Sequence, residues 1–303
     1  MKRTATRAIL ALLTLLLTAT ACSAGAQPRA EVVVTTNILG DITRQIVGDR
    51  ASVSVLMEAG ADPHSFGISA QQAAELEQAD LVVHNGLGLE EGVQRHVQTA
   101  RAEGVPTLAV AEQVDPLPIA GPGSQADPHF WTDPARVARA VGIIADHVVS
   151  NVDGIDAAAV KDQAAQYASQ VLAVEGEMAQ RFEQIPPERR KLVTNHHVFG
   201  YLAQRYGFEV IGAVIPSGTT LASPSASDLS SLADAVRRAG VRTIFADSSQ
   251  PDRLARVLAE QAGLDVRVTP LFSESLTAPG RGAATYLEMT RANTEAIASG
   301  LGA

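Results

Sequence analysis

Short runs rich in Val, Ile and Leu alternate along the chain with longer stretches in which apolar residues recur every three or four positions. In the first half, this pattern predicts strands at 31–36, 52–57, 81–85 and 107–110 and helices at 38–47, 69–78 and 92–102. The second half repeats the rhythm, with strands at 191–195, 209–214, 243–247 and 266–271 and helices at 199–205, 227–239 and 252–261. Such alternation is typical of parallel sheets flanked by helices.

Between the two halves, residues 155–185 contain no proline and a single glycine, and they are rich in strong helix formers. A helix of about 30 residues spans roughly 45 Å, which suits a stiff spine that permits only small rotations. The sequence therefore predicts an α/β protein of two lobes, each a parallel sheet flanked by helices, joined by one long rigid helix. We expect an N-terminal lobe at 31–130, a connecting helical region at 131–187 and a C-terminal lobe at 188–303.

The N-terminus has the pattern of an export signal. Three basic residues precede an aliphatic run at 9–17, small residues follow, and Cys22 comes next. The segment permits ordinary cleavage after Ala21, and it also resembles a lipoprotein signal in which Cys22 is acylated. Cys22 is the only cysteine, and a lone exposed thiol is a liability in an oxidising compartment, so lipidation explains it better. We therefore predict a signal peptide at 1–21, a tether at 22–30, and an extracytoplasmic protein anchored to the outer face of the membrane, or periplasmic if not lipidated.

Charge and composition exclude several classes of function. Residues 1–21 carry three basic and no acidic side chains, so the remaining chain has 21 basic and 33 acidic groups and a formal charge of −12. An acidic surface repels nucleic acid, and no basic stripe is evident. Aromatic residues make up only 4% of the chain, which disfavours a pocket for an organic solute such as a siderophore.

Four polar side chains follow predicted strands or occur in a repeated motif. His64 lies in GADPHSF at 60–66, His129 lies in DPHFWTDP at 127–134, and His196 closes a strand before HVFGY. The repeated Asp-Pro-His tripeptide strengthens the first two, because proline stiffens the presentation of the histidine. The fourth is Glu274, with Asp247 as the competing carboxylate.

Ligands in open α/β sheets bind beyond the carboxyl ends of the strands, so these side chains are expected to converge. Three imidazoles and one carboxylate suit Zn²⁺, whereas Mn²⁺ or Fe²⁺ prefers more oxygen ligands. Neutral imidazole is the ligating form, so we expect affinity to fall as the pH drops through about 6.5. We interpret His197 as a neighbouring or surface residue, and His84, His96 and His147 as structural.

The four motifs resemble those of the zinc/manganese ABC-transporter substrate-binding proteins. The strings at 60–66, 127–134, 195–201 and 271–276 match in order, and the likeness covers nearly all of residues 31–298. The resemblance implies that His64, His129, His196 and Glu274 hold a metal between two lobes, although the family usually has Asp where Glu274 stands. Manganese members commonly have a carboxylate at the third position, so His196 favours zinc.

The resemblance also implies a partner, the membrane permease of an ABC importer. Many zinc members carry a long His-rich loop before the second motif, but residues 114–126 are short and contain no histidine. Metal is therefore expected to arrive free or from a metallochaperone, and we expect the protein to be a monomer. Two alternatives are a secreted zinc hydrolase and an adhesin. The hydrolase is disfavoured because no H-E-x-x-H string occurs and four protein ligands leave no open position.

Overall fold

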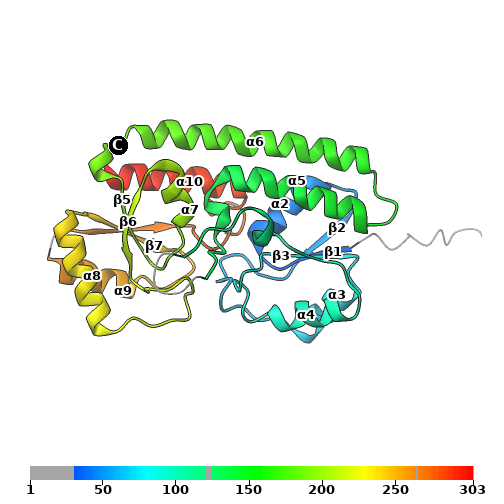
Figure 1. The fold of residues 1–303 in the computed structure, drawn as a ribbon, viewed down its shortest axis with the longest axis horizontal. Helices are drawn as coiled ribbons and strands as arrows, with labels where there is room; N and C mark the ends of the chain where they lie inside the picture. The colour runs from blue at the N-terminus through cyan, green and yellow to red at the C-terminus, as the bar shows by residue number, and fades with distance from the viewer. Residues whose placement is uncertain (1–30, 120–124, 264, 303) are drawn as a thin grey trace, which may run out of the picture.

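The computed structural model describes residues 31–119, 125–263 and 265–302. Two four-stranded sheets lie end to end, and one long helix runs along both of them (Figure 1). Within these ranges, no helix combines the length and apolar character needed to cross a membrane. The predicted signal peptide, the tether and Cys22 lie outside the described residues.

Both sheets are parallel and share one topology. The first contains β1 (Glu31–Val34), β2 (Ser52–Val55), β3 (Leu81–His84) and β4 (Thr107–Ala109), in the order β2-β1-β3-β4. The second contains β5 (Lys191–Thr194), β6 (Glu209–Ala213), β7 (Thr243–Asp247) and β8 (Arg267–Leu271), in the order β6-β5-β7-β8. The predicted fold class of two α/β lobes is confirmed.

Helices cover the sheets, and several of these helices begin at a residue whose side chain caps the helix. The first half has α2 (Asn37–Val47), α3 (Ala70–Gln78), α4 (Gln94–Ala102) and α5 (Pro134–Asn151); the second has α7 (Gly200–Tyr206), α8 (Ala226–Ala239), α9 (Arg253–Ala262) and α10 (Tyr286–Leu301). Ser69 and Ser225 each form a capping box, in which the side chain accepts a hydrogen bond from the third helical residue. These caps fix where α3 and α8 start.

The long helix α6 (Ala157–Glu183) begins at Asp156, whose side chain accepts a hydrogen bond from the Ala159 amide. One stripe of its surface is buried at intervals of three or four residues: Val160, Ala164, Tyr167, Val171, Val174, Met178 and Phe182. The stripe up to Val171 belongs to the core of the first half, and the stripe from Val174 onward belongs to a core of the second half. A single helix therefore contributes to both hydrophobic cores, which makes it a structural connection and not a loose linker.

Two further helices were not singled out by the sequence pattern. α5 starts at Asp133 with Pro134 in its first turn, and it packs along α6. α10 follows the segment that carries Glu274. Its buried Tyr286 forms hydrogen bonds with residues of the preceding part of the chain. The Tyr286 hydroxyl donates to the Trp131 carbonyl oxygen at 2.9 Å, and the Tyr286 amide donates to Asp41 Oδ2 at 2.8 Å.

Candidate metal centre

His64 is held in a loop after β2 by a short-range hydrogen bond. Asp62 Oδ1 accepts from the His64 amide at 3.1 Å, forming a turn of the Asx type across Pro63. Gly60 begins this loop with a φ of 77°, a left-handed backbone conformation that favours glycine. Its backbone N–H donates to the Leu276 carbonyl oxygen at 2.9 Å. The loop is thereby anchored to the segment that carries Glu274.

His129 is presented by the same device, which explains why the Asp-Pro-His tripeptide occurs twice. Asp127 Oδ1 accepts from the His129 amide at 3.0 Å and also lies 2.7 Å from His129 Nδ1. An Nδ1–H bonded to a carboxylate leaves Nε2 with its lone pair free. Asp127 thus fixes both the orientation of the ring and the nitrogen that faces the centre.

His196 and Glu274 come from the second half. His196 follows β5 and is fully buried, and neither of its ring nitrogens has a hydrogen-bond partner among the described residues. Glu274 follows β8 and is 1% exposed, and both of its carboxylate oxygens also have no hydrogen-bond partner there. Buried polar atoms without partners are costly, so this arrangement calls for a ligand.

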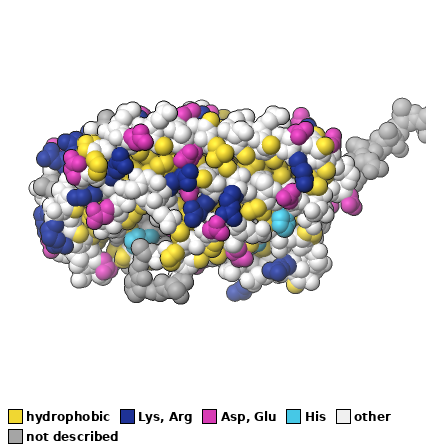
Figure 2. All heavy atoms as spheres, turned by 45° about the horizontal axis from the view of Figure 1, so that its top comes forward, with side chains coloured by type: hydrophobic (Ala, Val, Ile, Leu, Met, Phe, Trp, Pro, Cys, Tyr) yellow, Lys and Arg dark blue, Asp and Glu magenta, His cyan; other side chains and the backbone are white. Residues whose placement is uncertain are grey.

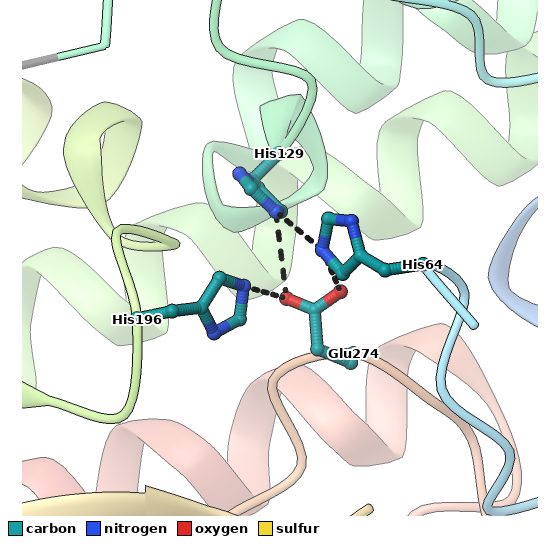
Figure 3. A group of neighbouring side chains, drawn as sticks. All are labelled: His64, His129, His196 and Glu274. Carbon is teal, nitrogen blue, oxygen red and sulfur yellow. Dashed lines mark hydrogen bonds and ion pairs between the residues drawn. The ribbon is translucent and has the colours of Figure 1, made fainter. Parts of the chain in front are cut away.

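The four side chains converge from separate loops on one point (Figure 3). His129 Nε2 lies 3.4 Å from His64 Nε2 and 3.7 Å from Glu274 Oε1, and His64 Nε2 lies 3.7 Å from Glu274 Oε2. His196 Nε2 lies 3.2 Å from Glu274 Oε1. A tetrahedral ion with bonds of about 2.1 Å has ligand–ligand separations of about 3.4 Å. The separations between these nitrogen and oxygen ligand atoms therefore fit a single small cation.

Burial sets the protonation of the cluster. It lowers the pKa of His64, His129 and His196, because a charged imidazolium loses its hydration there. Burial, followed by the nearby Asp247, raises the pKa of Glu274 well above its usual value. The imidazoles are neutral and ready to ligate at neutral pH, so protonation of these histidines moves below the pH range expected from the sequence.

The competing carboxylate is engaged elsewhere. Asp247 Oδ1 accepts from the Ser249 amide at 2.7 Å, and Asp247 Oδ2 is hydrogen-bonded to the Ser273 hydroxyl. Glu274, the residue after Ser273, is the carboxylate that lies among the three imidazoles. Asp247 therefore positions the segment next to Glu274 and adds negative charge around the centre.

The other histidines lie outside the cluster. His197 is half-buried and lines a cavity of about 280 Å³ together with Asp127. His84 ends β3, exposed His96 lies on α4, and half-buried His147 lies on α5. Asp62 and Asp127, which support the centre, were not identified by the sequence analysis as supporting residues, although both stand two positions before a predicted ligand.

Residues 32–300 match the family described as zinc-uptake complex component A, periplasmic. The chain belongs to this family. The resemblance inferred from the four motifs is therefore confirmed.

Relatives of the chain carry names with different metals. The chain is 26% identical over 272 residues to the manganese-binding lipoprotein MntA of Halalkalibacterium halodurans, covering 89% of this chain and 88% of that protein. It is 28% identical over 274 residues to the iron-binding protein YfeA of Yersinia pestis, covering 90% and 86%. These names describe metal-binding proteins and not enzymes, in agreement with the expectation that this chain is not an enzyme.

Solved structures show the same fold. The periplasmic zinc-binding protein TroA of Treponema pallidum superposes with a TM-score of 0.84 at 27% identity, covering 90% of this chain and 99% of that one. A manganese-bound periplasmic metal-binding protein of Candidatus Liberibacter asiaticus gives a TM-score of 0.80 at 26% identity, covering 90% and 100%. The likeness extends over both lobes and the long helix.

Proposed function

We propose that the protein is the substrate-binding component of an ABC importer, and that it captures a divalent transition metal and delivers it to a membrane permease. The observation that carries this proposal is the buried cluster of His64, His129, His196 and Glu274, in which His196 Nε2 and both Glu274 oxygens have no hydrogen-bond partner among the described residues. Acceptors that face one another at 3.2–3.7 Å are stabilised by a cation between them.

Zinc is the metal that this donor set favours. Three imidazoles and one carboxylate make a borderline-soft set with four protein ligands, which suits tetrahedral Zn²⁺. The zinc-binding name of TroA supports this choice, whereas MntA and YfeA are named for manganese and iron. Mn²⁺ or Fe²⁺ is the alternative cargo, and an oxygen-richer site would serve it better.

The two halves have separate roles in capture. His64 and His129 come from the first half and seat the ion, and His196 and Glu274 close over it from the second. Each pair offers two ligands, so a tight site forms only when both halves contribute.

The location and partners follow from the same proposal. Lipoprotein relatives such as MntA support an extracytoplasmic protein that is anchored through an acylated Cys22. The permease is the main partner, a metallochaperone is an optional source of metal, and the protein acts as a monomer. On the face shown in Figure 2, acidic and basic side chains are interspersed, which agrees with a role that does not involve nucleic acid.

Elemental analysis of protein purified without chelator tests the function and the metal together. We expect about one zinc ion per chain, with His129→Ala losing it and His96→Ala, an exposed histidine outside the cluster, retaining it. Competition between Zn²⁺ and Mn²⁺ in titration calorimetry then ranks the two metals. Stoichiometric binding that survives in His129→Ala would refute the site.

A further inference from the structure

Asp62 connects the first half to two loops of the second half. It is 6% exposed, and its Oδ1 accepts from the His64 amide. Its Oδ2 accepts from three side chains: the Ser65 hydroxyl at 2.8 Å, the Thr220 hydroxyl at 2.6 Å and Gln250 Nε2 at 2.9 Å. Ser65 belongs to the same loop, whereas Thr220 and Gln250 reach across from the other lobe. One carboxylate therefore supports a ligand and links the two lobes.

The bridge through Thr220 ends beside His196. Thr220 lies in the loop after β6, and the Ser217 carbonyl oxygen in this loop accepts from the His197 amide at 2.9 Å. His197 directly follows His196. Movement of this loop away from Asp62 would therefore displace the backbone next to His196.

The bridge through Gln250 ends beside Glu274. The backbone N–H of Gln250 donates to the Asp247 carbonyl oxygen at 3.4 Å. The Asp247 carboxylate is in turn hydrogen-bonded to the Ser273 hydroxyl. Ser273 directly precedes Glu274. The two connections from Asp62 thus lead to both ligands that the second half supplies, although Asp62 itself is not a member of the cluster.

We propose that Asp62 is a positioning residue that latches the second lobe over the bound metal and so sets the rate of metal release. This inference rests on the proposed function, because it requires a metal in the cluster. The bonds to Thr220 and Gln250 join the two lobes, and both are accepted by a carboxylate, which makes the stronger kind of hydrogen bond. Their loss destabilises the closed state without removing a metal ligand.

Thr220→Val tests the latch, because valine keeps the shape of threonine and removes the hydroxyl. We expect Zn²⁺ release into excess chelator, followed by stopped flow, to be about tenfold faster, which corresponds to about 1.4 kcal/mol. The association rate stays near that of the wild type, since open protein captures the ion. Gln250→Met gives a similar change, and Thr220→Ser, which retains the hydroxyl, restores slow release.

Ser65→Ala is the matched control. It removes a bond to the same Asp62 oxygen but leaves the cross-lobe bonds in place, so we expect release within about twofold of the wild type. All variants are first compared by thermal melting, and the release experiment is repeated with Mn²⁺.

Three results overturn the latch: release from Thr220→Val at the wild-type rate, equal acceleration in Ser65→Ala, or failure of Thr220→Ser to restore slow release. Wild-type protein that retains neither Zn²⁺ nor Mn²⁺ sinks the proposed function and the latch together. Wild-type protein that binds metal, together with an unchanged Thr220→Val variant, sinks the latch alone.

Discussion

Replacing Glu274 by glutamine changes the proton balance of metal binding as well as its strength. Glu274 is fully buried, and burial raises its pKa well above the usual value, with Asp247, Asp62 and Asp127 adding to the shift. The metal-free protein therefore takes up a proton on this carboxyl at a higher pH than an ordinary glutamate does, whereas the metal requires the ionised form. Glutamine has the same shape and no proton to lose.

The sign and size of the effect follow from linkage. Below the raised pKa of Glu274, an incoming ion must displace a proton, so affinity increases with pH by up to tenfold per unit, about 1.4 kcal/mol. Above that pKa, the dependence on Glu274 disappears. The imidazoles contribute little near neutrality because burial lowers the pKa of all three. Burial also raises the pKa of Asp127 to about 7. Any protons released from Asp127 therefore contribute equally to the proton counts of the wild type and of Glu274→Gln.

Titration calorimetry in buffers of different ionisation enthalpy counts the released protons. We expect Glu274→Gln to bind Zn²⁺ more weakly and to release about one proton fewer than the wild type at pH 6.5. Glu112→Gln, at an exposed carboxylate outside the cluster, serves as the control and should match the wild type. Equal proton release from wild type and Glu274→Gln would show that the carboxyl is ionised before metal arrives, and would refute the reasoning.

Three other predictions concern the surroundings of His129. Asp127→Asn removes the carboxylate partner of His129 Nδ1, and we expect titration calorimetry to show binding about 10- to 100-fold weaker; an unchanged affinity would contradict this role. Gly200→Ala places a Cβ 2.7 Å from Asp127 Oδ2, so calorimetry should show weaker binding although no ligand is lost, and unchanged binding would mean that Asp127 can shift freely. Trp131 is the only tryptophan, its ring centroid lies 5.3 Å from that of His129, and its Nε1 donates to the Ser273 carbonyl oxygen. Metal titration should therefore change its fluorescence, and a silent titration with proven binding would contradict the closeness of ring and metal.

Much of the fold could be predicted because buried parallel strands and amphipathic helices leave direct patterns. The long helix was expected at 155–185 and is observed at Ala157–Glu183. The strand 191–195 is observed at Lys191–Thr194, one residue shorter. The α10 helix was not predicted, because its buried residues include Thr290, Asn293 and Thr294, which weaken the apolar signal.

Some features of the candidate site could also be predicted from the sequence, and others could not. The four side chains that converge could be named because each follows a strand or a repeated Asp-Pro-His tripeptide. The choice between Glu274 and Asp247 could not be made from sequence, since it depends on which carboxylate the serines Ser249 and Ser273 engage. The bonds from Asp62 to Thr220 and Gln250 join positions more than 150 residues apart, and no local pattern reports them.

X-ray absorption spectroscopy of the zinc-loaded protein tests the convergence of the four side chains most directly, because scattering from imidazole rings counts the histidine ligands. We predict three imidazole nitrogens and one carboxylate oxygen at about 2.0–2.2 Å, with one imidazole lost in His196→Ala. A spectrum with one imidazole or none, or one left unchanged by His196→Ala, would contradict a metal centre built from both halves of the chain.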